Sequence, residues 1–202
     1  MTGQPTKRGP GRPRSKEAEQ AILDAAYELF RSRGFRGVST RDIAAAAHVG
    51  RQTIYLWWDN KNQLMVAALL SRAVPETEFP EGLSAKATLE RQMGLLIEAF
   101  SGETGRLIRD IIAEGQSDPE LLVTYRDQFL SIRRQQTKEI LHRGIEEGEF
   151  DPDLELDVAI DLLYAPIYFR LLVQHQPLDQ GLATELPSLG LRSLMKRVPD
   201  SE

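Results

Sequence analysis

Residues 39–64 read STRDIAAAAHVGRQTIYLWWDNKNQL, and this stretch decides the fold. Residues 39–42 form a capping box, in which a serine and an aspartate three positions apart satisfy each other's backbone donors, and they predict a helix through about residue 47. Residues 48–50 form a turn, and the apolar spacing that follows predicts a second helix over 51–58. Two short helices joined by so tight a turn are typical of a helix-turn-helix, here at 39–58.

The second of these helices has an apolar face and a polar face. Ile54 and Trp58 lie four residues apart and therefore share one face, which can pack on the first helix. The apolar residues expected to complete this small core are Ile43, Ala44, Ala47 and Val49. The face opposite carries Arg51, Gln52, Thr53, Tyr55 and Leu56.

This polar face has the residue types that read duplex DNA. Arginine pairs with guanine in the major groove, glutamine pairs with adenine, threonine contacts a thymine methyl or a phosphate, and tyrosine contacts phosphate. Residues at the starts of neighbouring helices are placed to reach the DNA backbone. The predicted DNA-contacting set in this region is Thr40, Arg41, Gly50, Arg51, Gln52, Thr53, Tyr55, Leu56 and Lys61.

The same region resembles the TetR (tetracycline-repressor) family of transcriptional regulators over about residues 15–74. Beyond residue 74 the chain agrees with the family in length and helical layout rather than by motif. The resemblance implies a dimeric regulator with a DNA-binding head and a second domain that forms an intermolecular four-helix bundle and encloses a small-molecule pocket. The matching residues are Gly34-Phe35, Ser39-x-x-x-Ile43-Ala44, Ala47-x-Val49, Thr53-Ile54-Tyr55 and Trp58-x-x-Lys61-x-x-Leu64.

Two residues of the turn depart from the family pattern. His48 stands where the family usually has glycine, so we expect a histidine with positive φ at this position. Gly50 stands where a serine or threonine usually caps the second helix, and glycine caps adequately but offers no hydroxyl to a phosphate. The fold is unaffected by these departures, but base contacts carried over near this helix start are in doubt.

Residues 1–14 form a basic arm without hydrophobic periodicity. Gly11-Arg12-Pro13 within the arm resembles the core of an AT-hook, an extended segment that enters a narrow A·T minor groove. The alternative is a flexible tail that attracts DNA without sequence preference, and the sequence favours neither. The arm holds Lys7, Arg8, Arg12 and Arg14, of which Arg8, Arg12 and Arg14 are predicted DNA contacts.

The charge is divided unequally along the chain. Residues 1–74 hold 12 Lys and Arg against 6 Asp and Glu, whereas residues 75–202 hold 13 against 24, within an overall net charge of −5. A basic front on an acidic body is expected when one end meets a polyanion. We therefore predict an all-α protein of about nine helices: a flexible arm, a three-helix helix-turn-helix head at 15–74, and a helical-bundle ligand and dimerisation domain at 75–202.

The C-terminal part of the chain is helical by its periodicity. The run Asp151-Pro152-Asp153 marks a helix start. Residues 162–173, LLYAPIYFRLLV, are apolar nearly all round and too few to span a bilayer, so we expect protein to cover them. The helices at 154–175 and 179–196 are therefore the predicted homodimer seam. The helices expected beyond the head cover about 84–101, 103–115, 119–147, 154–175 and 179–196.

An effector pocket between the head and this seam is implied by the family resemblance. Aromatic residues at helical spacing are more often core than ligand contacts. Arg170 is unusual inside an apolar run, and it either pairs with an acid such as Asp161 or meets an anionic ligand; we favour the ion pair. The candidate pocket residues are Phe100, Leu107, Ile111, Tyr125, Phe129, Tyr164, Tyr168 and Arg170.

Other classes of function find no support in the sequence. The chain has no cysteine and three scattered histidines, which removes thiolate metal sites and cysteine nucleophiles. No catalytic triad, P-loop or glycine-rich nucleotide motif appears, so we predict neither enzymatic activity nor a cofactor. No secretory signal is visible, and a soluble, cytoplasmic protein without a membrane partner is expected.

The sequence thus predicts a DNA-binding transcriptional regulator. We expect it to bind double-stranded DNA at a near-palindrome as a homodimer and to respond, as a repressor, to a small-molecule effector that the sequence does not identify. The alternative is a ligand-blind DNA-binding dimer, either an architectural protein or an activator, in which the C-terminal domain only dimerises.

Overall fold

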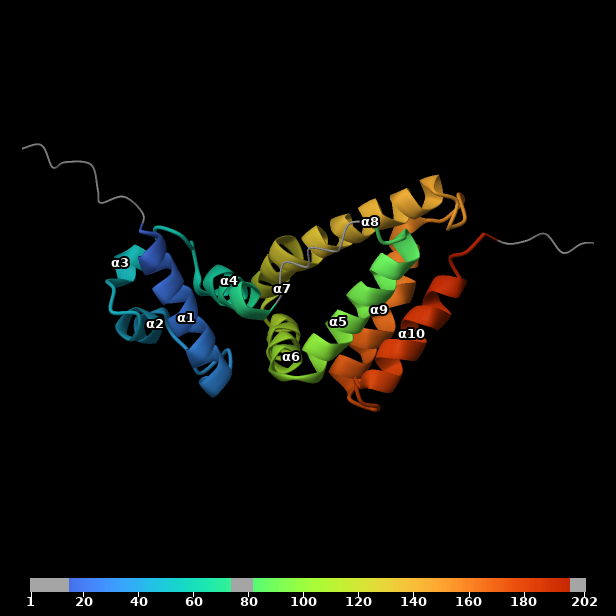
Figure 1. Ribbon diagram of the computed structural model, residues 1–202. Coiled ribbons are helices and arrows are strands. Elements are labelled where there is room, and N and C mark those ends of the chain that lie inside the picture. The colour runs from blue at the N-terminus through green and yellow to red at the C-terminus, as the bar shows by residue number, and fades with distance from the viewer. Residues whose placement is uncertain (1–14, 74–81, 197–202) are drawn as a thin grey trace, which may run out of the picture.

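The computed structural model describes residues 15–73 and 82–196, and the regular structure in these ranges is helical except for one antiparallel bridge between Phe150 and Met195 (Figure 1). The predicted all-α class is confirmed. The predicted arm at 1–14 lies outside the described residues. The elements in chain order are α1 (Lys16–Arg33), α2 (Thr40–Ala46), α3 (Arg51–Ile54), α4 (Lys61–Ala73), α5 (Ala85–Ser101), α6 (Glu103–Gly115), α7 (Pro119–Tyr125), the π-helical turn η1 (Arg126–Leu130), α8 (Ser131–Glu146), α9 (Leu156–Val173) and α10 (Gln180–Arg192).

Side-chain caps fix where several of these helices begin. Ser15 caps α1 by accepting a hydrogen bond from the amide three residues on, at 3.4 Å. Ser39 and Asp42 form the predicted capping box of α2, with both reciprocal hydrogen bonds present. Asp118 caps α7 directly before Pro119, which occupies the first helical position. The local sequence therefore sets these boundaries before any tertiary contact forms.

The head consists of α1, α2 and α3 at one end of the molecule (Figure 1). Gly34 ends α1 with a φ of 71°, and Phe35 then turns back so that its ring meets Phe30 edge-on at 6.1 Å between centroids. Ile43 of α2 and Ile54 of α3 are buried in the same core. Packing of α4 along α1 and onward against α6, α7 and η1 makes this core continuous with that of the body.

The body is formed by α5, α8, α9 and α10, with α6 and α7 between them and α4 (Figure 1). Its strongest packing is between α10 and α5, and α9 packs on both α8 and α10. The helix predicted at 119–147 is one helical run in which η1 separates α7 from α8. Such π-helical turns insert an extra residue into the helix and often lie at functional sites. None of the described helices combines the length and the apolar character that crossing a bilayer requires.

Some helix boundaries differ by two to four residues from the approximate ones that the sequence predicts. Helix α9 begins at Leu156 with Glu155 as its N-cap, and not at 154 after the Asp151-Pro152-Asp153 run. Asp151 instead accepts a hydrogen bond from the amide of Asp153 within the preceding turn, at 2.9 Å. Helix α10 ends at Arg192, four residues before the predicted end, and α3 ends at Ile54 and not at Trp58.

Candidate nucleic-acid interface and effector cavity

The turn between α2 and α3 has the backbone that its unusual residues predict. His48 takes a φ of 54°, as expected where the family has glycine. Gly50 is the N-cap of α3 and provides no side-chain hydrogen bond. After Ile54 the chain continues in a tight helical turn, in which the amide of Leu56 donates to the carbonyl of Thr53 at 3.2 Å. Helix α3 is therefore short, and the helical turn that follows Ile54 extends it.

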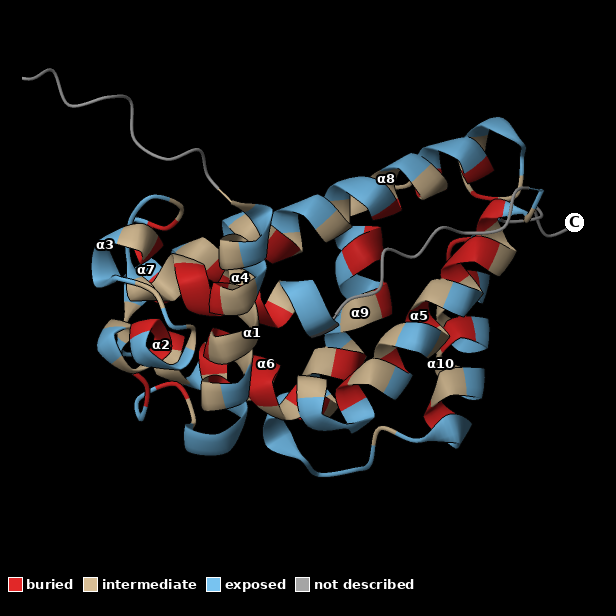
Figure 2. Cartoon of the chain, turned by 60° about the vertical axis from the view of Figure 1, so that its left-hand side comes forward, coloured by how far each residue is buried: buried red, intermediate tan, exposed pale blue. Residues whose placement is uncertain are grey.

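The polar face of α3 lies on the outside of the head (Figure 2). Gly50, Arg51 and Gln52 are exposed, whereas Thr53 is half-buried. Tyr55 is 45% exposed and Leu56 is 53% exposed. The preceding residue, Ile54, is buried in the core of the head and is only 1% exposed. Most of this face is therefore exposed to solvent and accessible to a macromolecular partner.

A pair of hydroxyl groups joins α2 to the end of α3. The Oγ1 atom of Thr40 lies 3.4 Å from the hydroxyl oxygen of Tyr55, and Arg41 beside Thr40 is exposed. Hydrogen bonding to Thr40, and then to Arg51, lowers the pKa of the Tyr55 phenol. The structure thus brings Thr40, Arg51 and Tyr55 together from two helices. Two hydroxyls and a guanidinium form a suitable set of donors for a phosphate.

Lys61 differs from the other predicted DNA contacts. Its Nζ donates to the carbonyl of Phe35 at 2.6 Å and lies 4.3 Å from the centroid of the Phe35 ring. Burial lowers the pKa of the Lys61 ammonium, against the opposing effect of Glu114 and Asp118. Lys61 therefore fastens the start of α4 to the segment after α1, and a phosphate contact would require this hydrogen bond to be exchanged. Arg8, Arg12 and Arg14 lie outside the described residues.

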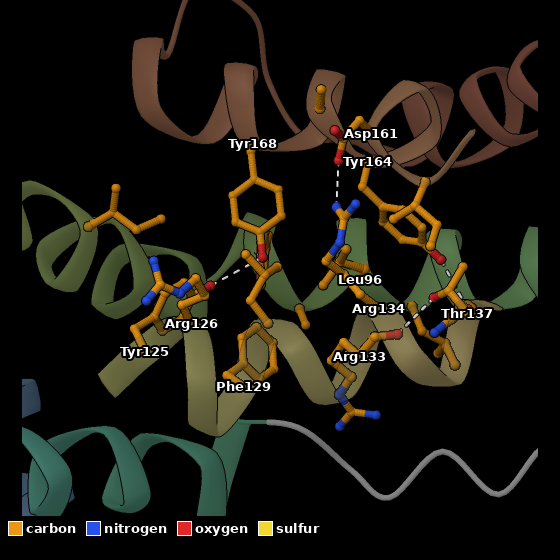
Figure 3. Close-up of a pocket in the computed structure, with 18 of the residues that line it drawn as sticks. Leu96, Tyr125, Arg126, Phe129, Arg133, Arg134, Thr137, Asp161, Tyr164 and Tyr168 are labelled. Atoms are coloured by element: carbon orange, nitrogen blue, oxygen red, sulfur yellow. Dashed lines mark hydrogen bonds and ion pairs between the residues drawn. The ribbon is translucent and has the colours of Figure 1, made fainter. Parts of the chain in front are cut away.

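The body holds a cavity of about 930 Å³, which is within the usual range of small-molecule sites (Figure 3). Five of the predicted pocket residues line it: Phe100, Tyr125, Phe129, Tyr164 and Tyr168. Tyr125 and Phe129 lie on either side of the start of η1, so the π-helical turn contributes directly to the wall.

Three predicted pocket residues lie elsewhere. Leu107 and Ile111 are fully buried in the hydrophobic core and do not line the cavity. Arg170 donates from Nη1 to the carbonyl of Pro177 at 2.9 Å. The predicted ion pair between Arg170 and Asp161 is wrong, because Asp161 pairs with Arg134 of α8 instead. Arg170 therefore fastens α9 to the loop before α10.

Three tyrosines inside the cavity are held by hydrogen bonds. The hydroxyls of Tyr125 and Tyr168 lie 3.1 Å apart, and Tyr164 donates to Gln92 Oε1 at 3.0 Å. Burial raises the pKa of all three phenols, and it raises that of Tyr164 to about 12. They therefore stay protonated at neutral pH. The cavity interior is uncharged at these positions.

Sequence reasoning missed the arginines of the cavity. Five arginines contribute to its lining, and none of them was among the predicted pocket residues. Arg126 and Arg133 are seven residues apart on the helical run that carries Tyr125 and Phe129, and this spacing could have indicated them. The lining arginines are Arg72, Arg91, Arg126, Arg133 and Arg134.

Arg72 belongs to both the cavity and the head. It lies near the end of α4, lines the cavity, and donates from Nη2 and Nε to Asp24 Oδ1 of α1 at 2.8 and 3.2 Å. The hydrogen bond from Arg72 is the main cause of the lowered pKa of the Asp24 carboxyl. A second link joins Asn62 of α4 to Asp118, the cap of α7, at 3.0 Å. Helix α4 is thus tied to the head at its cavity end and to the body at its other end.

The short α2–turn–α3 unit with an exposed polar face, carried on a helical body with a cavity, defines a helix-turn-helix DNA-binding transcriptional regulator. Residues 22–68 match the model of the bacterial regulatory proteins of the tetR family, and residues 79–188 match that of the tetracyclin repressor-like C-terminal domain. The chain belongs to the TetR family.

Individual relatives agree with this assignment over most of their length. The chain is 35% identical to the HTH-type transcriptional regulator YdeS of Bacillus subtilis (strain 168), over 87% of this chain and 89% of that protein. It is 28% identical to the HTH-type transcriptional repressor KstR2 of Rhodococcus jostii (strain RHA1), over 70% and 72% of the two chains. The crystal structure of the TetR family transcription regulator SCO0332 is similar with a TM-score of 0.69 and 27% identity, over 88% of this chain and 98% of that one.

Proposed function

We propose that this chain is a ligand-responsive repressor that binds a near-palindromic operator as a homodimer. The observation that carries the proposal is the exposed polar face of α3, with Arg51 and Gln52 exposed and the hydroxyls of Thr40 and Tyr55 beside them. Arg51 and Gln52 are suited to base edges, and the hydroxyl pair is suited to phosphate. The similarity to KstR2, which is named a transcriptional repressor, supports repression as the effect of operator binding.

An apolar stripe along α9 supports dimerisation. Five large apolar side chains of this helix are between 40% and 63% exposed, and α10 adds Leu189 at 62%. Their spacing places them along one face, and so continuous an apolar surface is typical of a protein interface. Two-fold pairing through this stripe would set two copies of α3 about one helical turn of DNA apart. The stripe on α9 consists of Val158, Leu162, Phe169, Leu172 and Val173.

A route from the cavity to the head supports ligand control. A ligand that fits one position of α4 better than another shifts the population toward that position, and only such differential affinity can drive a switch. Arg72 lines the cavity and holds α1 through Asp24, so a ligand that engages Arg72 changes the α1–α4 contact. The cavity favours this proposal over the ligand-blind alternative, since a body that only dimerises needs no such space.

Gln52→Ala and Tyr55→Phe are expected to weaken operator binding in different ways. Removing the Gln52 amide should relax the preference for one base pair in each half-site by about 1–3 kcal/mol. Removing only the Tyr55 hydroxyl should weaken binding to all sequences about equally, by roughly fivefold, because a phosphate contact carries no base information. A gel-shift panel of single-base operator variants at fixed salt measures both effects.

Gln135→Ala provides the matched control, since Gln135 is exposed on α8, far along the chain from the head. Its base-preference profile and affinity should equal those of the wild type. The proposal fails if Gln52→Ala keeps the wild-type preference at every operator position.

A further inference from the structure

The cavity has a charge opposite to that of the body around it. Residues 75–202 hold 13 Lys and Arg against 24 Asp and Glu, yet the cavity is lined by five arginines and by two carboxylates, Glu98 and Asp161. A recess with low-dielectric walls concentrates the field of the charges that line it. The cavity is therefore suited to an anion, although the body as a whole repels one.

Most of this positive charge is already neutralised by ion pairs within the chain. Arg72, Arg126 and Arg134 each form an ion pair with an aspartate. Arg91 and Arg133 form no ion pair with any residue that the structure describes. Arg91 is exposed and can be neutralised by solvent ions, whereas Arg133 is half-buried. Arg133 is thus the cavity cation that most needs a counter-charge.

The surroundings of Arg133 leave most of its donors available. Its Nη1 donates to the amide oxygen of Gln136 at 3.0 Å, and its Cζ lies 5.9 Å from the centroid of the Phe129 ring. A guanidinium has five N–H donors and stays charged in proteins. Burial lowers the pKa of Arg133, and no carboxylate of the described ranges opposes the effect. Its guanidinium points away from the hydroxyls of Tyr125 and Tyr168 (Figure 3).

Apart from the exposed side chains of Arg91 and Glu98, the rest of the cavity is apolar or internally satisfied. Phe100 and Tyr168 meet edge-on at 5.5 Å between ring centroids, and the tyrosine hydroxyls bind each other or Gln92. Aliphatic side chains complete the walls. The interior therefore favours a ligand body without charge, and the charge requirement lies at Arg133. The aliphatic lining residues include Leu95, Leu96, Ala99, Ile112, Leu122 and Ile160.

We propose that the cavity binds amphipathic carboxylates, with the carboxylate paired to Arg133 and an apolar chain filling the interior. A planar guanidinium can bind both oxygens of a carboxylate, which makes this pairing stronger than one to a neutral hydroxyl. The inference rests on the ligand-responsive function proposed above and names the class of its effector.

Calorimetric titration with dodecanoate and with 1-dodecanol tests the inference, because the two probes share a chain and differ in charge. The wild-type protein should bind dodecanoate at least about tenfold more tightly than 1-dodecanol. Arg133→Met should lower the affinity for dodecanoate by about tenfold to a hundredfold and change that for 1-dodecanol by about twofold at most. Arg133→Lys should restore part of the dodecanoate affinity.

Arg109→Met is the matched control, since Arg109 is a half-buried arginine of α6 that does not line the cavity, and it should keep dodecanoate affinity within about threefold of the wild type. Circular dichroism confirms that each variant is folded. The inference is overturned if the wild type does not bind dodecanoate, if it binds both probes equally, or if Arg133→Met binds dodecanoate as the wild type does. Operator binding is measured in parallel, with and without dodecanoate. If dodecanoate binds to the protein but does not release DNA, the ligand-responsive function fails while the inference stands.

Discussion

Phe169→Glu is expected to abolish the proposed homodimer and to weaken operator binding by roughly 100-fold or more. Phe169 is 56% exposed on the apolar stripe of α9, in the run that the sequence predicts to be covered by protein. In a two-fold interface the substitution places a carboxylate on both sides, and desolvating each unpaired charge costs several kcal/mol. Loss of the dimer then removes the second half-site contact. Light scattering coupled to size exclusion measures the mass, and fluorescence anisotropy measures the DNA affinity.

Ile132→Glu is the control for this experiment. Ile132 is a large apolar residue of nearly equal exposure, 52%, but it lies on α8, outside the α9 stripe. The substituted protein should remain dimeric and bind the operator with unchanged affinity. A Phe169→Glu protein that remains dimeric at low micromolar concentration would show that the interface lies elsewhere.

Arg72→Met is expected to abolish effector-driven release of DNA while leaving operator affinity without effector within about threefold of the wild type. Arg72 is the residue that both lines the cavity and binds α1, through Asp24. Its ion pair is half-exposed and contributes little to stability, so the expected effect is on communication. Coupling between two sites usually changes affinity by about 5–150-fold, and this change should disappear. Operator affinity is measured with and without saturating dodecanoate.

Two further variants make this result specific. Asp24→Asn removes the other partner of the ion pair and should give the same uncoupled behaviour. Arg126→Met removes a cavity arginine that pairs with its neighbour Asp127 and not with the head, so its response to effector should persist. Release of DNA from Arg72→Met equal to that from the wild type would exclude Arg72 as the link.

The parts of the molecule that sequence predicts well are those set by local chemistry. The capping box of Ser39 and Asp42 and the positive φ of His48 both depend on residues within a few positions of each other. The exposed face of α3 also follows from local spacing, because Ile54 must face the core and its neighbours then cannot. The family resemblance over the head then indicates DNA reading as the function of that face.

The parts that sequence could not predict depend on which helices pack together. Lys61 binds the carbonyl of Phe35, a contact 26 residues away that no helical periodicity encodes. Asp161 pairs with Arg134 and not with Arg170. The carboxylate of Asp161 faces the neighbouring helix α8, which carries Arg134. The spacing of Arg126 and Arg133 could have indicated these two, but the full arginine wall of the cavity appears only when α4, α5, η1 and α8 are assembled.

Selection of duplexes from a random-sequence DNA pool tests most directly whether the outer face of α3 enters DNA. At low salt the wild-type protein should enrich a near-palindrome whose half-site centres are about one helical turn, or a whole number of turns, apart. Gln52→Ala should enrich the same site with one position degenerate in each half. Enrichment of no sequence by the wild type, or of an identical site by both proteins, would contradict the assignment of this face as the DNA-reading surface.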